Sequence, residues 1–319
     1  CMPANEPEYG ATPPATFASR EISAPEGRQL LWLAAFVIVL SGCLVALALA
    51  YLRGEEIESA ERLTESFAQV IEEQTTRTLQ SVDQSLQITA IRLAQMQTSG
   101  TLNEESARQL LRDQLQTMPF ARVLWVTDAQ GRLIHESGVG NLGADLSDTD
   151  YFKALQAAPQ TQFLVNGPVK SRIDGFWLIP AARPLLDANG RFAGTIAASV
   201  NPMFFDRLWQ SIDLGSGGSV SLLRTDAVLL ARSPFHELSM GKNFETTPVF
   251  ADLLPKQEVG LTHSVSVIDG VARLIAYRKL STQPGLVVLV GQSFDHALQP
   301  WRRLAVLATG IWLVAAIGG

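Results

Sequence analysis

A run of 23 uncharged residues, from Leu30 to Leu52, limits what this chain can fold into more than any other feature of its sequence. A helix of that length, at about 1.5 Å per residue, crosses the hydrocarbon core of a bilayer. We therefore predict a transmembrane helix at 30–52. Two alternatives stay open: Ala46–Ala48 resembles a signal-peptide cleavage site, and Leu40–Cys43 resembles a lipobox, although nine apolar residues follow Cys43.

The two ends of the chain extend this interpretation. Residues 1–29 are rich in Pro, Ala, Glu and Ser without an apolar period, which is typical of a disordered tail. Arg20 and Arg28 precede the apolar run and Arg53 follows it, so the positive-inside bias predicts that the tail is cytoplasmic. The last 16 residues are again uncharged, and we expect 301–319 to begin a second, truncated transmembrane helix.

Residues 53–118 are expected to form a long stalk helix followed by a shorter one. From Arg53 to about Gln97, apolar residues recur at intervals of mostly three and four, and no Pro or Gly interrupts them after Gly54. Such a helix is about 65 Å long, and its apolar stripe favours a homodimer through the long helix. Asn103 is a plausible N-cap for the second helix, which ends near Met118.

From Ala121 onward the pattern changes to short apolar runs with period two, and the same order of elements occurs twice. Each copy begins with two strands around a turn, continues with a loop and a short helical stretch, and ends with a three-stranded meander. The first strands begin at Arg122 and Ser219, and the last strands at Phe192 and Leu286. This nearly constant spacing indicates a repeated structural unit. We therefore predict an α+β fold with a long N-terminal helix and two five-stranded antiparallel modules, at 119–212 and 213–300.

Several short sequence motifs in these modules resemble those of a known family: Asp148–Phe152, Gly167–Arg172, Gly175–Pro180, Gly190–Gly194, Asp213–Ser219 and Asp269–Arg273. Together with the long helix and the flanking apolar segments, they resemble the double Cache (PDC-type, PAS-like) extracytoplasmic sensor region of bacterial transmembrane receptors. The resemblance covers about residues 30–319. The chain departs from the family at Thr149, where an Arg is common, and at Ala227, where Asp-Gly is the usual turn.

The resemblance implies a receptor of the bacterial inner membrane with its sensor body in the periplasm. The membrane-distal module, 119–212, would hold a small ligand such as a carboxylate or an amino acid. The membrane-proximal module, 213–300, would pass the change to the second span. Family members usually carry a cytoplasmic histidine kinase, diguanylate cyclase or chemotaxis domain, and we expect the output domain outside this sequence.

Six residues of the first module are candidate ligand contacts: Asp150, Tyr151, Arg172, Trp177, Arg183 and Ser199. The guanidinium groups of Arg172 and Arg183 suit a ligand carboxylate. The alternative is a structural ion pair or a solvated strand end. The second meander has two strand arginines of its own, Arg273 and Arg278, but no Trp, and we predict that these arginines are strand residues without a site.

Three of the other four candidates also have two interpretations each. Tyr151 and Trp177 would wall a pocket, with the Tyr hydroxyl as a polar group, or would pack in the core. Asp150 would receive a ligand amine or cap the helix that it opens. Ser199 would face the same pocket, but the pattern does not fix its side.

Several classes of function are disfavoured. The net charge of −6 does not suggest a nucleic-acid partner. Cys1 and Cys43 lie outside the polar body, so no disulfide framework is expected there, and the four histidines lack metal-ligand spacing. We expect no cofactor and no metal. With no catalytic grouping, an extracytoplasmic enzyme is the least favoured function. The main alternative to sensing is a dimerisation or protein-interaction module without a small-molecule site.

Overall fold

The computed structural model describes residues 24–171 and 175–318. Most of the predicted tail, and the candidate Arg172, lie outside these residues. The chain divides into two compact units. One consists of the terminal segments, up to Leu52 and from Arg303, and the other is Arg53–Arg302.

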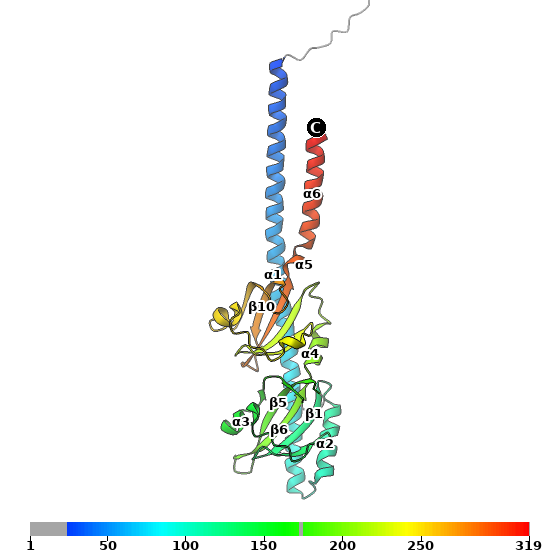
Figure 1. Ribbon diagram of the computed structural model, residues 1–319, viewed down its shortest axis with the longest axis vertical. Helices are drawn as coiled ribbons and strands as arrows, with labels where there is room; N and C mark the ends of the chain where they lie inside the picture. The colour runs from blue at the N-terminus through cyan, green and yellow to red at the C-terminus, as the bar shows by residue number, and fades with distance from the viewer. Residues whose placement is uncertain (1–23, 172–174, 319) are drawn as a thin grey trace, which may run out of the picture. The chain divides into compact units, whose positions relative to one another are not determined.

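The first unit contains two apolar helical segments. Helix α1, Ala24–Thr98, is a single helix of 75 residues, so the predicted apolar segment and stalk are continuous (Figure 1). Helix α6, Gln299–Gly318, follows the short helix α5, Phe294–Ala297. Both α1 and α6 are long and apolar enough to cross a membrane, and their most apolar windows are unburied. Trp312 of α6 packs at Gly42 of α1 and donates its indole N–H to the Ser41 hydroxyl at 3.1 Å.

Helix α2, Glu104–Gln116, precedes the first sheet. Asn103 is its N-cap, as predicted, because the Asn103 side chain accepts a hydrogen bond from the Ser106 backbone N–H at 2.9 Å. The Ser106 hydroxyl in turn accepts from the Asn103 N–H, completing a capping box. These paired bonds satisfy backbone donors that the first helical turn leaves without partners.

The first module is one antiparallel sheet with the order β2-β1-β6-β5-β3, and β4 also pairs with β5. Helix α3, Asp150–Ala157, lies between β2 and β3 in the chain. The strands are β1 (Ala121–Asp128), β2 (Leu133–Glu136), β3 (Leu164–Val165), β4 (Val169–Lys170), β5 (Trp177–Leu186) and β6 (Phe192–Val200). The prediction of five strands misses one here: Pro168 has no N–H to donate, and the expected first meander strand is split around it.

The second module repeats this topology, with the order β8-β7-β11-β10-β9. Helix α4, Pro202–Trp209, connects the modules and is capped by Asn201. The strands are β7 (Ser219–Arg224), β8 (Leu229–Ser233), β9 (Val259–Val265), β10 (Ala272–Lys279) and β11 (Leu286–Ser293). Where the first module has α3, the second has a 3₁₀ turn, Glu237–Ser239, and a single π-helical turn, Val249–Leu253. The predicted repeat is thus confirmed.

Helix α1 packs along one face of both sheets (Figure 1). Its Thr64 hydroxyl lies 3.2 Å from the Gln292 side-chain oxygen of β11, whereas Asp83, farther along the helix, pairs with Arg183 of β5. Strand side chains alternate between the two faces of a sheet. Every second residue of the central strands is therefore buried against α1, and the alternate residues are free to build a site on the opposite face.

Candidate ligand-binding site

The sheet face opposite α1 in the first module holds two of the predicted residues. The Tyr151 hydroxyl accepts a hydrogen bond from the Trp125 indole N–H at 3.0 Å, and the two rings meet edge to face. Burial is the main reason why the pKa of Tyr151 is raised, so its phenol is neutral at physiological pH. The Ser199 hydroxyl accepts from the Val123 backbone N–H at 2.9 Å. Tyr151 and Ser199 therefore supply fixed polar groups on this face.

Much of this face is covered by helix α3. Tyr151, Phe152 and Leu155 of α3 pack on Ala182 of β5 and Ala197 of β6, and all five are buried. The small alanine side chains let the helix approach the sheet closely. The alternative interpretation of Tyr151 as a core residue is therefore realised, and its hydroxyl adds a polar group to that core.

Arg183 lies on the other face of the sheet. Its guanidinium forms an ion pair with Asp83 of α1, and the two side chains are only 15% and 27% exposed. Ala181, two residues earlier on β5, is buried in the core that α1 shares with the sheet. Arg183 and Tyr151 are thus on opposite faces, and the structural ion pair that the sequence left open is present.

Trp177 lies at the junction of the two modules. Lys170 of β4 places its ammonium group 5.3 Å from the centre of the Trp177 ring and forms an ion pair with Glu237 of the second module at 3.0 Å. A side chain on Gly241, also in the second module, would come within 3.8 Å of the Trp177 ring. Trp177 therefore lies against the second module and not on the Tyr151 face.

Asp150 is exposed and borders a groove between the modules. The groove also includes Asn166 and Arg224, whose guanidinium donates to the Asn166 side-chain oxygen at 3.3 Å. The N-cap of α3 is Thr149, and Asp150 is the first helical residue. The helix begins at Asp150, as predicted, so the residue at the N-cap position is Thr149 and the capping role considered for Asp150 is wrong. A carboxylate in the first turn still suits the helix dipole.

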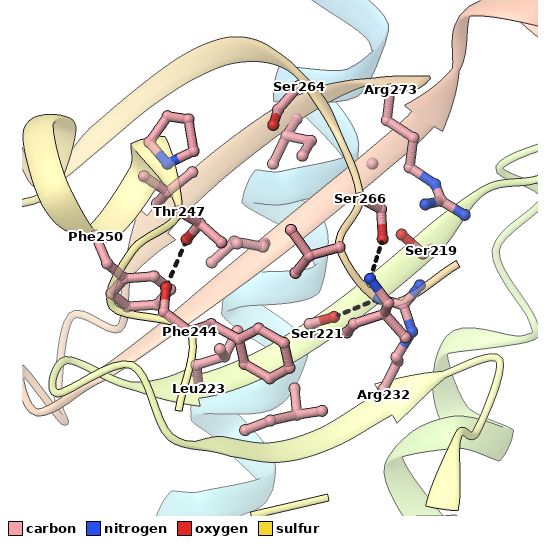
Figure 2. Close-up of a pocket in the computed structure, with 18 of the residues that line it drawn as sticks. Ser219, Ser221, Leu223, Arg232, Phe244, Thr247, Phe250, Ser264, Ser266 and Arg273 are labelled. Carbon is pink, nitrogen blue, oxygen red and sulfur yellow. Dashed lines mark hydrogen bonds between the residues drawn. The ribbon is translucent and has the colours of Figure 1, made fainter. Parts of the chain in front are cut away.

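A cavity of about 80 Å³ lies on the second sheet, on the face opposite α1 (Figure 2). Its apolar part includes Phe244 and Phe250, and the sheet contributes Ile275 and Leu289. Figure 2 shows Arg232 and Arg273 together at one side of the cavity, with the phenylalanine rings at the other. The cavity therefore has one cationic end and one apolar end.

The cationic end is organised by Asp269, in the turn between β9 and β10. Arg273 donates two hydrogen bonds to the Asp269 carboxylate, at 2.7 and 2.8 Å, and Arg232 donates a third at 2.8 Å. Arg232 also donates to the Ser221 hydroxyl at 3.0 Å, and Arg273 to the Gly217 carbonyl oxygen at 2.7 Å. Burial by itself would raise the pKa of Asp269, but the bonds from Arg273 and Ser266 lower it well below its ordinary value.

Sequence reasoning missed this constellation. The sequence predicts Arg273 as a strand arginine without a site, and it gives no prediction for Arg232. The Asp-Gly-Val-Ala-Arg motif at 269–273 contributes to the family resemblance but is not among the predicted site residues. Its spacing places the Asp in a turn and the Arg on the next strand, which is a usable signal for an ion pair. Nothing in the local sequence indicates that Arg232 of β8, 37 residues away from Asp269, joins them.

The comparisons with known proteins agree with the fold of the two modules. Residues 202–291 match a family described as dCache_1-like, a histidine kinase sensor domain. The chain is 29% identical to the extracellular domain of rpHK1S-Z16, a protein described as a histidine kinase, with a TM-score of 0.68 over 75% of this chain and 96% of that one. The two modules are thus similar to double Cache sensor regions. The resemblance expected from the sequence is thereby confirmed.

More distant solved structures share the fold of this chain. The periplasmic sensory domain of the Campylobacter jejuni chemoreceptor Tlp1 is 13% identical, with a TM-score of 0.62 over 77% of this chain and 99% of that one. The ligand-binding domain of the Pseudomonas fluorescens chemoreceptor CtaA, solved with L-isoleucine, is 15% identical, with a TM-score of 0.60 over 78% and 98%. A search of curated protein sequences finds no match.

Proposed function

We propose that this chain is the ligand-sensing region of a bacterial membrane receptor, and that its first module binds a small amino acid or carboxylate. The observation that carries the proposal is the extent of the shared fold. Both modules, and not one alone, align with CtaA, solved with L-isoleucine, and with PctB of Pseudomonas aeruginosa, solved with L-Arg. On the Tyr151 face, the phenol and the Ser199 hydroxyl supply polar groups for an amino-acid ligand.

The first module is the membrane-distal one in this proposal. Along α1, Glu61 and Thr64 contact the second module, and Asp83 contacts the first. The apolar segment of α1 precedes all three residues, and α6 follows the second module directly. The second module therefore contacts α1 closer to its apolar segment than the first module does, and α6 follows the second module, which supports two membrane spans with the first module far from them.

The junction between the modules is the proposed relay. The Lys170–Glu237 ion pair, the packing of Trp177 at Gly241 and the Arg224–Asn166 hydrogen bond connect the β3–β5 edge of the first module to the second. A ligand shifts an equilibrium only by its difference in affinity for the two arrangements. Movement of this edge on binding would supply such a difference.

The remaining parts of the receptor follow from the same proposal. The helical segments 30–52 and 301–319 anchor it in the inner membrane, with both chain ends cytoplasmic and the body in the periplasm. The match to a histidine kinase sensor domain favours a histidine kinase over a diguanylate cyclase as the output domain. A homodimer through α1 is supported by its exposed residues Leu63, Val70 and Ile91, which repeat at multiples of seven.

A thermal-shift screen of the full chain in detergent tests ligand sensing. Amino acids and small carboxylates are added singly, because a ligand that binds only the folded state raises the melting temperature in proportion to RT ln(1 + [L]/Kd). We expect at least one amino acid to stabilise the protein, and Tyr151→Phe, which removes only the hydroxyl, to weaken that stabilisation. If no compound in the panel stabilises the chain, the proposal fails.

A second candidate function is a dimerisation or protein-interaction module without a small-molecule site. The dense packing of α3 on the first sheet and the exposed apolar residues of α1 favour it. Replacing Leu63 and Val70 with Glu would then abolish signalling in a full-length receptor, whereas Tyr151→Phe would leave it intact. The reverse pattern supports the sensor.

A further inference from the structure

The second module carries a charge imbalance that its own residues do not neutralise. The side chains of Arg232 and Arg273 are only 5% and 3% exposed, and both pair with the single carboxylate of Asp269. Two guanidinium groups and one carboxylate leave one net positive charge. Buried charges are costly unless they are paired. Within the described residues, no second carboxylate pairs with either arginine, so the site favours an additional anion.

Arg232 is the arginine that can receive such an anion. Arg273 already directs three nitrogens to Asp269 and Gly217. Arg232 has five N–H groups, and among the described residues it donates to only two acceptors, Ser221 and Asp269. Burial and the neighbouring charge of Arg273 work against the protonated form of Arg232. An anion in the cavity would relieve this repulsion.

The sheet is shaped to hold these groups beside the cavity. Gly291 of β11 has no side chain, and a Cβ there would lie 2.6 Å from the Arg273 Cδ atom. Arg273 can therefore cross the strand and reach the Gly217 carbonyl oxygen. Ser219 and Ser266 add hydroxyl groups at the same end of the cavity, as Figure 2 shows. Hydroxyl groups and a guanidinium are suitable donors for carboxylate oxygens.

The rest of the cavity selects by size and polarity. About 10–15 Å³ of such cavity volume is enough to hold one water molecule, so 80 Å³ has room for a short organic acid. Phe244, Phe250 and Leu289 surround the far end and offer no charged partner for an ammonium group. The ligand therefore has one anionic end and a short apolar tail.

We propose that the second module binds a small monocarboxylate, with the carboxylate at Arg232 and a short aliphatic tail among Phe244, Phe250 and Leu289. This site is separate from the one proposed for the first module and does not depend on it. It gives the receptor a second input in the module that follows the junction. A receptor with both sites would respond to an organic acid as well as to its first-module ligand.

Calorimetric titration of the full chain in detergent tests the site, with propionate and isobutyrate as probes. Propionamide is the matched control, because it has nearly the same size as propionate but no charge. We expect both acids to bind at concentrations up to about 10 mM and propionamide to bind at least about tenfold more weakly. If neither acid binds, or if propionamide binds equally well, the proposal is overturned.

Three variants locate the binding. Arg232→Gln removes the guanidinium proposed to bind the carboxylate, while Asp269 keeps Arg273 as its partner. This variant should weaken propionate binding about tenfold or more. Ser264→Trp is the second test, because Ser264 borders the cavity from the edge strand β9, where a large side chain blocks the space with little effect on the core. Arg278→Gln is the control, since it removes the same charge from the opposite face of β10. Unchanged propionate binding in both Arg232→Gln and Ser264→Trp overturns the site.

The two proposed sites can be refuted independently of each other. Tyr151→Phe lies in the first module and should leave propionate binding unchanged, whereas Arg232→Gln should leave the amino-acid response unchanged. If Tyr151→Phe weakens propionate binding and Arg232→Gln does not, propionate is a ligand of the first module, and the second-module site is refuted while ligand sensing stands.

Discussion

The ion pair between Asp83 and Arg183 ties the long helix to the first sheet, and its removal gives the sharpest test of how that module is held together. Asp83→Asn keeps the size of the side chain but removes its charge. Arg183 then keeps a guanidinium that is only 15% exposed, on the sheet face that packs against α1. The variant therefore creates a largely buried cation without its partner.

The loss of unfolding free energy in Asp83→Asn lies between two known limits. Exposed ion pairs contribute about 0–1 kcal/mol, whereas removing one partner of a fully buried pair costs about 3–5 kcal/mol. Asp83 is 27% exposed, so water partly screens the pair. We expect Asp83→Asn to lower the free energy of unfolding by about 2 kcal/mol. The double variant Asp83→Leu with Arg183→Met should cost less than Asp83→Asn, because it leaves no unpaired charge.

Urea denaturation of the full chain in detergent, followed by tryptophan fluorescence, measures these changes. The exposed pair Glu73–Arg77 of α1 is the matched control, and Glu73→Gln should cost less than about 0.5 kcal/mol. If Asp83→Asn is no more destabilising than Glu73→Gln, or if the double variant is the worst of the three, the pair does not hold α1 on the sheet and the reasoning is refuted.

Three further changes test other parts of the fold. Gly194→Ala should destabilise the first module by more than about 2 kcal/mol, seen as a lower urea midpoint, because φ is +141° and the new Cβ would overlap the Thr127 carbonyl oxygen. Asn103→Ala should lower the free energy of unfolding by about 1 kcal/mol through loss of the α2 cap, again measured by urea denaturation. Asn103→Asp keeps a capping oxygen and should lose much less. Asp269 has a lowered pKa in the folded state, so its contribution should be complete at neutral pH and should be lost only as the pH falls through that lowered value. Melting temperatures of wild type and Asp269→Asn should therefore converge in strong acid, and a constant difference would contradict the assignment.

The sequence predicts the repeated architecture well because its signals are local. The Asn189-Gly190 turn, the alternation along 192–200 and the uninterrupted helical period after Gly54 each report on backbone conformation within a few residues. Two copies of the same order then fix the arrangement of modules. The split of one strand at Pro168 is the main difference, and it too has a local cause that the sequence contains.

The site residues are harder to place because their roles depend on which strand face each occupies and on distant partners. Arg183 and Ser199 are on neighbouring strands, yet Arg183 faces α1 and Ser199 faces away from it. A shift of one residue in a strand boundary reverses such an assignment. Trp177 is near the break at Pro168 and contacts Gly241 of the other module. Arg232 of β8 reaches Asp269, in the turn before β10, only because β8, β7, β11 and β10 pair in that order.

The contrast between α3 and the π-helical turn at Val249–Leu253 has a consequence for how such modules diversify. The two sheets have the same strand order, but the insert after the second strand differs in length and in its aromatic residues. In the first module the eight-residue helix covers part of the sheet face, whereas the five-residue turn of the second leaves the space beside Arg232 open. The room on the second sheet is thus set by one short segment. Transplanting an α3-like helix into 247–256 should close the cavity without altering a single strand.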